Sequence, residues 1–297
     1  MRRRPSPDTP CRTRPPRSVL APCSALAPLA LLALLAVLLP ACAALPGGTR
    51  APEAGGLTVV TYNIRAGQDT ARLPNLERVA ALLDTLGADV ALLQEVDRGT
   101  RRSGRVDQVA ELERLTGMAA LFGKSMDYDG GDYGIALLTR LPIREHAVVR
   151  LTPPPVEGEE SSEPRVALYA LLETPAGALP VLNTHLDAGE GTHRRQEMLT
   201  LLATIQRRAG GHGPLVVGGD LNARPESAEL AAATLVLDDA WPRCGAGDGL
   251  TFPAHAPDRR IDYVLLRGLE CAGARVHPST ASDHRPLAVE VAWPGAR

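Results

Sequence analysis

The chain has 297 residues, 44% of them hydrophobic, which suffices for one or two globular domains with a sizeable core. Aromatic residues make up only 3%, and the formal net charge is −2. The scarcity of aromatic rings argues against a stacking platform for single-stranded nucleic acid. The lack of a basic surplus argues against tight binding of long duplex DNA.

The first 41 residues differ in composition from the rest of the chain. They hold six arginines and one acid, Asp8, so that residues 42–297 carry 26 basic and 33 acidic residues, a charge of about −7. No charged residue occurs from Ser18 to Thr49, and this stretch contains a strongly apolar run. A basic region, an apolar region and small residues at its end are typical of an export signal.

The apolar run ends in Leu39-Pro40-Ala41-Cys42, which resembles a bacterial lipobox with a lipidated cysteine. We therefore predict a signal peptide with a lipobox over residues 1–41. The protein would then be an exported, membrane-anchored lipoprotein on the periplasmic or outer-surface face. An uncleaved transmembrane anchor and a cleaved, soluble export signal stay open as alternatives. Residues 42–56 are small and rich in Gly and Pro, and predict a flexible tether.

From Leu57 onward the chain alternates between strand and helix patterns. Apolar runs of strand length and amphipathic runs at helical spacing predict the following order: strand 57–64, helix 74–87, strand 89–96, helix 106–116, strands 133–139, 147–151, 165–173 and 179–183, helix 190–208, strand 214–218, helix 227–233, and strands 260–266 and 286–291. Many hairpin-like strand pairs with few helices favour an α/β fold of two packed mixed sheets flanked by helices. Residues 57–297 are predicted to be one domain.

Polar residues follow directly on several of the apolar strands. Four acids, two amides and two histidines occupy such positions: Asn63, Glu95, His185, Asp220, Asn222, Asp262, Asp283 and His284. Taken singly, each suits a turn or a solvent-exposed strand end. Together they suit hydrolysis of a phosphoester, which needs acids for a hard cation, a base near neutral pH, and donors to the phosphoryl oxygens.

The segments that carry these residues resemble the endonuclease/exonuclease/phosphatase superfamily, which has the DNase I-like fold, and in particular its small exported bacterial members. The matching segments occur in the family's order: TYNIRAG, LLQEVD, YGIALLTR, NTHLD, GGDLNARP, RIDYVLL and SDHRPL. The resemblance covers about residues 57–293. It implies a four-layer αββα sandwich and a Mg²⁺- or Mn²⁺-dependent phosphoric ester hydrolase.

Carried over by motif, the resemblance assigns Asn63 and Glu95 to the metal site, with Glu95 as the direct ligand. It assigns Asp283 as a second acid of that site. His185 resembles the histidine that contacts the phosphate or protonates the leaving group. Arg65 departs from the pattern, since some repair nucleases have an acid there, and this weakens a DNA-repair function.

The remaining four residues resemble the groups that activate water. Asp220 and Asn222 resemble the pair that orients the attacking water and binds phosphate. His284 resembles the general base, and Asp262 the carboxylate behind it. Asp220 and His284 are expected to share the activation of the water.

The segment from residue 95 to 112 also resembles proteins that remodel GPI lipid anchors. Arg102, Arg105, Asp107 and Gln108 could line the substrate entrance there, but we favour a solvated loop and an ordinary helix start.

The sequence thus predicts a metal-dependent phosphoesterase that hydrolyses a phosphodiester or phosphomonoester outside the cytoplasm. Its substrate would be a lipid head group, a small phosphate or nucleic acid. The alternatives are a secreted endonuclease or exonuclease acting on DNA, and a catalytically inactive surface-binding module. Membrane attachment would come from the N-terminal lipid or anchor. No protein partner is evident, and we expect a monomer. Cys244 and Cys271 form either a disulfide or two buried thiols.

Overall fold

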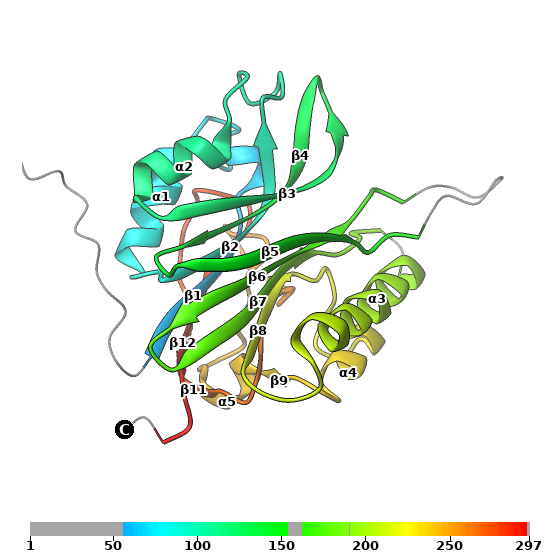
Figure 1. Cartoon of the computed structure of the whole chain (residues 1–297). Helices are drawn as coiled ribbons and strands as arrows, with labels where there is room; N and C mark the ends of the chain where they lie inside the picture. Colours follow the sequence, from blue (N-terminus) through cyan, green and yellow to red (C-terminus); the bar gives the residue numbers. More distant parts are fainter. Residues whose placement is uncertain (1–55, 154–161, 190, 296–297) are drawn as a thin grey trace, which may run out of the picture. The chain divides into compact units, whose positions relative to one another are not determined.

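The computed structural model describes residues 56–153, 162–189 and 191–295 (Figure 1). The predicted signal peptide, its lipobox and nearly all of the predicted tether therefore lie outside the described residues. No helix within the described ranges is long and apolar enough to cross a membrane.

The described part contains twelve strands and five α-helices. The strands are β1 (Gly56–Asn63), β2 (Val90–Arg98), β3 (Ala119–Tyr128), β4 (Gly131–Thr139), β5 (Ile143–Arg150), β6 (Val166–Thr174), β7 (Gly177–His185), β8 (Leu215–Asp220), β9 (Asp238–Asp239), β10 (Asp262–Arg267), β11 (Glu270–Val276) and β12 (Leu287–Ala292). The helices are α1 (Leu76–Thr85), α2 (Gln108–Thr116), α3 (Gly191–Ala209), α4 (Ala228–Ala233) and α5 (Ala240–Cys244), with one 3-10 turn, η1 (Arg65–Gly67).

The strands form two six-stranded mixed sheets, in the orders β11-β12-β1-β2-β4-β3 and β5-β6-β7-β8-β10-β9. Each sheet has one parallel pair, β1 with β2 and β7 with β8, while its other neighbours are antiparallel. Helix α1 connects the first parallel pair and α3 the second, as expected for parallel strands, which need a long crossover.

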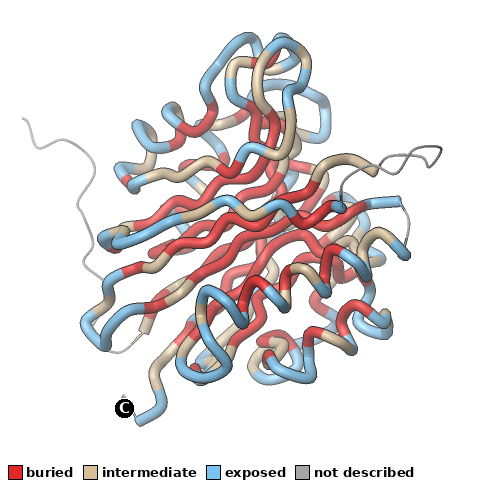
Figure 2. The backbone as a smooth tube through the Cα atoms, turned by 45° about the vertical axis from the view of Figure 1, so that its right-hand side comes forward, coloured by how far each residue is buried: buried red, intermediate tan, exposed pale blue. Residues whose placement is uncertain are grey.

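The central core lies between the two sheets. It is built almost entirely from aliphatic side chains of both sheets, among them Val59, Leu92, Leu137, Leu168 and Val216. Figure 2 shows these strands as the buried interior of the domain. Because aromatic residues are scarce, leucine and valine fill this layer, and each fully buried side chain contributes roughly 1.5–3 kcal/mol.

A separate apolar cluster covers the outer face of each sheet. Val79, Leu83 and Leu112 of α1 and α2 pack on the β1–β2 side, and Met198 and Leu230 of α3 and α4 pack on the β7–β8 side. Figure 1 shows these two helix pairs on opposite faces of the paired sheets. The expected four-layer αββα sandwich of the DNase I-like fold is therefore confirmed.

Local sequence explains how the helices begin and end. Asp107 accepts hydrogen bonds from the backbone N–H groups of Val109 and Ala110, both at 3.1 Å, and so caps α2. At its other end α2 is closed by Gly117, whose φ of +65° is the left-handed conformation that favours glycine. The ordinary helix start that we favoured for Asp107 is what the structure shows.

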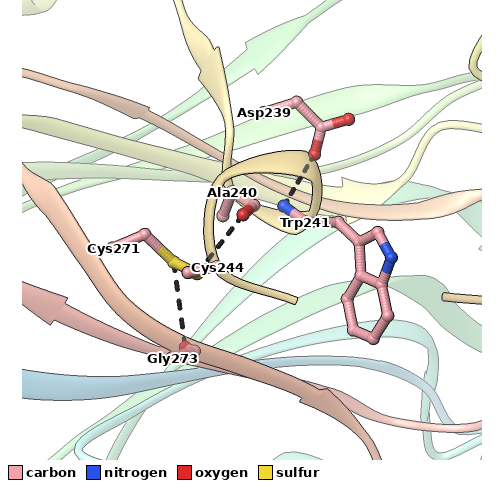
Figure 3. Close-up of a disulfide and its surroundings, with 6 residues drawn as sticks. All are labelled: Asp239, Ala240, Trp241, Cys244, Cys271 and Gly273. Atoms are coloured by element: carbon pink, nitrogen blue, oxygen red, sulfur yellow. Dashed lines mark hydrogen bonds between the residues drawn. A yellow bond between two sulfur atoms is a disulfide. The ribbon is translucent and has the colours of Figure 1, made fainter. Parts of the chain in front are cut away.

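Four elements were missed by the sequence patterns. Strands β3 and β11 are mostly half-exposed edge strands, so they lack the apolar runs by which the others were recognised. Strand β9 has two residues and α5 has five, too few for either period to show. Helix α5 is held by a disulfide between Cys244 and Cys271, which ties it to β11 (Figure 3).

Candidate active site

The eight predicted residues lie at one edge of the paired sheets. The two parallel pairs end there, at Asn63 of β1 and at His185 and Asp220 of β7 and β8. Strand β10 is antiparallel to β8, so it begins at the same edge, and Asp262 lies opposite Asp220 in the register. His284 precedes β12, which is antiparallel to β1.

Asn63 connects the two sheets at this edge. Its amide nitrogen donates to Glu95 Oε1 at 2.9 Å and to Asp220 Oδ2 at 3.1 Å. Its side-chain oxygen accepts the backbone N–H of Arg65 at 3.0 Å, which fixes the amide orientation. The fully buried Asn63 thus holds one carboxylate from each sheet close together.

Glu95 reaches the site because β2 is bulged. The pairing of β2 with β4 shifts register between Leu93 and Val96, and Glu95 itself has a φ of +54°. A bulge re-aims a side chain that regular pleating would send elsewhere. The strained backbone at Glu95 therefore accompanies the placement of its carboxylate beside Asn63.

His284 and Asp262 form a buried dyad. The imidazole Nδ1–H donates to Asp262 Oδ2 at 2.9 Å, and Nε2 lies 3.6 Å from Asp220 Oδ2. The ring of Phe252 packs against the imidazole, with centroids 4.6 Å apart. The arrangement fixes the ring, leaves Nε2 facing Asp220, and matches a histidine supported by a carboxylate.

Burial and mutual charge shift the pKa values of this group. Burial raises the pKa of Asp220 from 3.8 to about 7, and the nearby Asp262 carboxylate adds to the rise. Burial alone would lower the pKa of His284, but Asp262 and then Asp220 outweigh it and raise the value to about 10. The two carboxylates therefore stabilise the imidazolium form of His284.

His185 lies on the other side of Asp220. Its Nε2 is 3.6 Å from Asp220 Oδ2 and 3.1 Å from the amide nitrogen of Asn222. Its Nδ1 faces a guanidinium nitrogen of Arg165 at 3.1 Å. Burial lowers the pKa of His185 well below 6.5, and Arg165 lowers it further.

Asp283 is placed differently from a free metal-site acid. Its Oδ2 forms an ion pair with Arg65 Nε at 3.2 Å, and its side chain is about one third exposed. Arg65, the residue that departs from the family pattern, thus contacts the predicted second acid of the metal site. Asp283 borders the site but already has a cationic partner.

The structure accordingly brings all eight residues to one place. Six of them line a single recess of about 460 Å³, and Asn63 and Asp262 are fully buried behind it. A hollow of the same size at the other end of β1 is lined by Asp84, Asp89 and Arg275 among others, but it has no histidine and no comparable cluster. We therefore place the candidate active site in the recess at His284.

The comparison with known families agrees with this geometry. The model of the Endonuclease/Exonuclease/phosphatase family matches residues 60–284. The chain belongs to this family. Members of the family are usually phosphoester hydrolases, and the matched span begins within β1 and ends at His284.

Individual relatives share the fold and part of the sequence. A UPF0294 protein of Vibrio cholerae is 32% identical over 136 residues, which cover 42% of this chain and 44% of that protein, so the chain spans less than half of this relative. An endonuclease/exonuclease/phosphatase of Beutenbergia cavernae has a TM-score of 0.65 at 22% identity, covering 82% of this chain and 72% of that one. The mannosyl-6-phosphatase of Bacteroides thetaiotaomicron has a TM-score of 0.68 at 20% identity, covering 80% and 100%.

Two buried amide side chains connect strands that carry active-site residues. Gln94 donates to Asn183 Oδ1 at 2.7 Å, and Asn183 donates to the carbonyl oxygens of Leu93 and Ala136. Both side chains are fully buried between the sheets. Neither is among the eight residues predicted from the sequence, although both interrupt apolar strands close to residues of that set. They lock together the strands that carry Glu95 and His185.

The wall of the recess holds one of the four entrance candidates. Arg102 lines it, held by two hydrogen bonds of 2.8 Å to the buried Asp97 and stacked 4.5 Å from the ring centre of Tyr128. Arg105 instead donates to backbone carbonyl groups of Gly99 and Gly130, and Gln108 is buried and binds backbone atoms. Of the four candidates, only Arg102 therefore lies where a bound substrate would contact it.

The donor set fits a hard divalent cation. Glu95 and Asp220, drawn together by Asn63, would hold it through carboxylate oxygens, the ligands that Mg²⁺ and Mn²⁺ prefer. Ligand atoms of Asp220, Asp262 and His284 also lie within 4.8 Å of one another. However, His284 Nδ1 and Asp262 Oδ2 bind each other, so this second group suits proton transfer better than a cation.

Proposed function

We propose that this protein is a Mg²⁺- or Mn²⁺-dependent phosphoesterase that hydrolyses a compact phosphodiester or phosphomonoester outside the cytoplasm. One observation carries the proposal. Asp220 Oδ2 lies 3.6 Å from the Nε2 atoms of both His185 and His284, and 3.1 Å from the amide of Asn63 beside Glu95. A cation site, a base and donors to phosphate thus meet around one carboxylate.

Each group has a role that its surroundings favour. A bound divalent cation would supply positive charge to offset the charge on the phosphoryl oxygens. Asp220 and His284 together take the proton of the attacking water, and Asp262 supports the resulting imidazolium. Asn222 and His185 lie side by side at 3.1 Å and contact the phosphoryl oxygens.

The recess favours a compact substrate. Its volume of about 460 Å³ is within the range of small-molecule sites. Apolar and aromatic side chains such as Met126, Tyr128 and Phe252 line it together with Arg102 and Arg259. A lipid head group or a sugar phosphate suits such a mixture, and a related structure is named a mannosyl-6-phosphatase.

The N-terminal sequence supports the proposed location. The export signal and the lipobox at Cys42 would attach the protein to a membrane, with the folded domain outside the cytoplasm. Labelling with radioactive palmitate in a bacterial host, with Cys42→Ser as the control, tests this part. Absence of lipid on the wild-type chain would favour a cleaved signal or an uncleaved anchor.

A substrate panel tests the activity. The protein with Mg²⁺ or Mn²⁺ is assayed on bis-p-nitrophenyl phosphate, sugar phosphates, sphingomyelin, phosphoinositides and plasmid DNA. We expect turnover of small phosphoesters and little cleavage of plasmid DNA. Efficient plasmid cleavage would favour a secreted nuclease, and no turnover of any substrate would favour an inactive binding module.

Two variants tie the activity to the site. His284→Ala and Asp220→Ala should each lower kcat by roughly 10²- to 10⁴-fold, the range for losing general acid–base help. His146→Ala on the exposed face of β5 is the matched control and should leave kcat unchanged. Activity of either site variant within tenfold of the wild type would remove that residue from the mechanism.

A further inference from the structure

Arg165 is a buried arginine outside the eight residues predicted from the sequence. It immediately precedes β6, its side chain is 6% exposed, and one guanidinium nitrogen lies 2.9 Å from Glu163 Oε1 and 3.1 Å from His185 Nδ1. Its backbone is fixed as well, because its N–H donates to Thr152 Oγ1 at 2.7 Å and its carbonyl accepts from Leu151 at 2.9 Å. The guanidinium is therefore held against the imidazole.

This contact determines where the proton of His185 lies. A guanidinium has only donors, so Nδ1 of His185 must be the acceptor in the hydrogen bond with Arg165. A neutral imidazole has one donor and one acceptor nitrogen, which leaves the hydrogen on Nε2. A cationic imidazole would instead turn an Nδ1–H toward the N–H of Arg165, and the two donors would repel each other. The lowered pKa of His185 has the same direction.

The Nε2–H of His185 then lies beside a second donor. The Asn222 amide nitrogen is 3.1 Å away, and it also donates to the backbone carbonyl of Leu186 at 3.0 Å. Asp220 Oδ2 also faces Nε2, but at 3.6 Å it lies beyond hydrogen-bond distance, and an acceptor shared by the Nε2–H and the amide N–H would relieve the close approach of the two donors. A phosphoryl oxygen in the recess would accept from both, as in a preorganised oxyanion site.

We infer that Arg165 is a positioning residue that fixes His185 as the neutral Nε2–H tautomer, so that His185 and Asn222 donate jointly to one phosphoryl oxygen. His185 then cannot be the acid that protonates the leaving group. Only the joint donation to a phosphoryl oxygen rests on the proposed function, since the tautomer of His185 is a property of the free protein. It decides between the two roles that the family resemblance leaves open for His185.

The tautomer is measured directly by ¹⁵N NMR of the full chain with labelled histidine, at pH 7, both in EDTA and with Mg²⁺. His185→Asn identifies the His185 signals among those of the seven histidines. We expect a protonated Nε2 and an unprotonated Nδ1 in both conditions. A protonated Nδ1 in the wild type, from either the other tautomer or the cation, would overturn the inference whether or not any substrate is found.

Variants of Arg165 give the second readout. Arg165→Met removes the donor at similar volume, and Arg165→Lys keeps a donor if the methionine variant is poorly folded. We expect Arg165→Met to give a mixture of tautomers and to lower kcat roughly tenfold to a hundredfold, with KM changed less than threefold. The kcat value should depend as steeply on the leaving group in this variant as in the wild type.

Arg140→Met is the matched control. Arg140 is also an arginine with little exposure, but it follows β4 at the opposite edge, where its guanidinium binds the carbonyl of Ala88. It should change neither the His185 signals nor kcat. An Arg165→Met protein with wild-type tautomer and wild-type kcat would refute the positioning role. Leaving-group dependence that is steeper in His185→Asn than in the wild type would refute it too, because it would show that His185 protonates the leaving group.

Discussion

Replacing Asp262 by asparagine removes one negative charge from behind His284 while changing almost no volume. Asp262 is fully buried, and its Oδ2 accepts the Nδ1–H of His284 at 2.9 Å. Together with Asp220 it raises the pKa of His284 from 6.5 to about 10 against the opposing effect of burial. That shift corresponds to on the order of 5 kcal/mol in favour of the imidazolium.

The expected loss follows from this shift. Asp262 is the larger of the two carboxylate contributions, so Asp262→Asn should remove at least about half of the stabilisation. If His284 carries positive charge in the transition state, the loss of half of this stabilisation lowers the rate by roughly 10²-fold. Loss of the equivalent support in hydrolytic triads costs about 10⁴-fold. We therefore expect kcat to fall by roughly 10²- to 10⁴-fold.

The assay combines kinetics with titration. The kcat of Asp262→Asn is measured on bis-p-nitrophenyl phosphate with Mg²⁺, and the His284 imidazole is titrated by NMR in EDTA. The pKa should drop well below its raised value, because burial disfavours the cation and only Asp220 then opposes that effect. Asp89→Asn is the control: Asp89 is a buried aspartate that accepts from Thr58 N at the far end of β1.

A double variant sharpens the test. Since Asp262 acts through His284, the Asp262→Asn/His284→Ala enzyme should be no slower than His284→Ala alone. A further tenfold loss in the double variant would show that Asp262 has an independent role. A His284 pKa that stays at about 10 in Asp262→Asn would refute the electrostatic argument itself.

Three further predictions concern the metal and the framework. Chelation with EDTA should abolish turnover and readdition of Mg²⁺ or Mn²⁺ should restore it, while Glu95→Gln should weaken Mn²⁺ binding at least tenfold by calorimetry. Gly219→Ala should lower the free energy of unfolding by about 2 kcal/mol or more in urea titrations. This is because φ is +145° and a Cβ would come within 1.9 Å of Thr184 O. The Cys244→Ser/Cys271→Ser double variant should lose about 3.5 kcal/mol, since the disulfide closes a 27-residue loop. An equal urea midpoint under reducing and oxidising conditions would contradict the last expectation.

The sequence was sufficient to predict the layered fold and the meeting of the eight polar residues. Buried strands such as β2 and β8 are continuous apolar runs, and the polar residue that ends such a run stands out against it. Edge strands have no such contrast. Strand β3 is half-exposed over most of its length, so neither alternation nor apolar content identified it.

The local geometry of the site could not be predicted in the same way. Nothing in LLQEVD shows that Glu95 sits on a bulge with positive φ, since the bulge exists only through pairing with β4. Arg165 is similar, because its importance arises from a contact across two strands and not from a motif. The pairing of Cys244 with Cys271, left open by spacing alone, required α5 to lie against β11.

The site lies where it does because each sheet contains one βαβ unit. In β1–α1–β2 and in β7–α3–β8 the strands are parallel, so their carboxyl ends share an edge. Packing of the two sheets brings those edges together, and Asn63 bonds across them to Asp220 at 3.1 Å. Antiparallel neighbours contribute only where they begin, which is why Asp262 is the first residue of β10 and His284 precedes β12. A phosphoester bound here would therefore contact both halves of the chain at once. Catalysis would then depend on the packing between the sheets as much as on any single side chain.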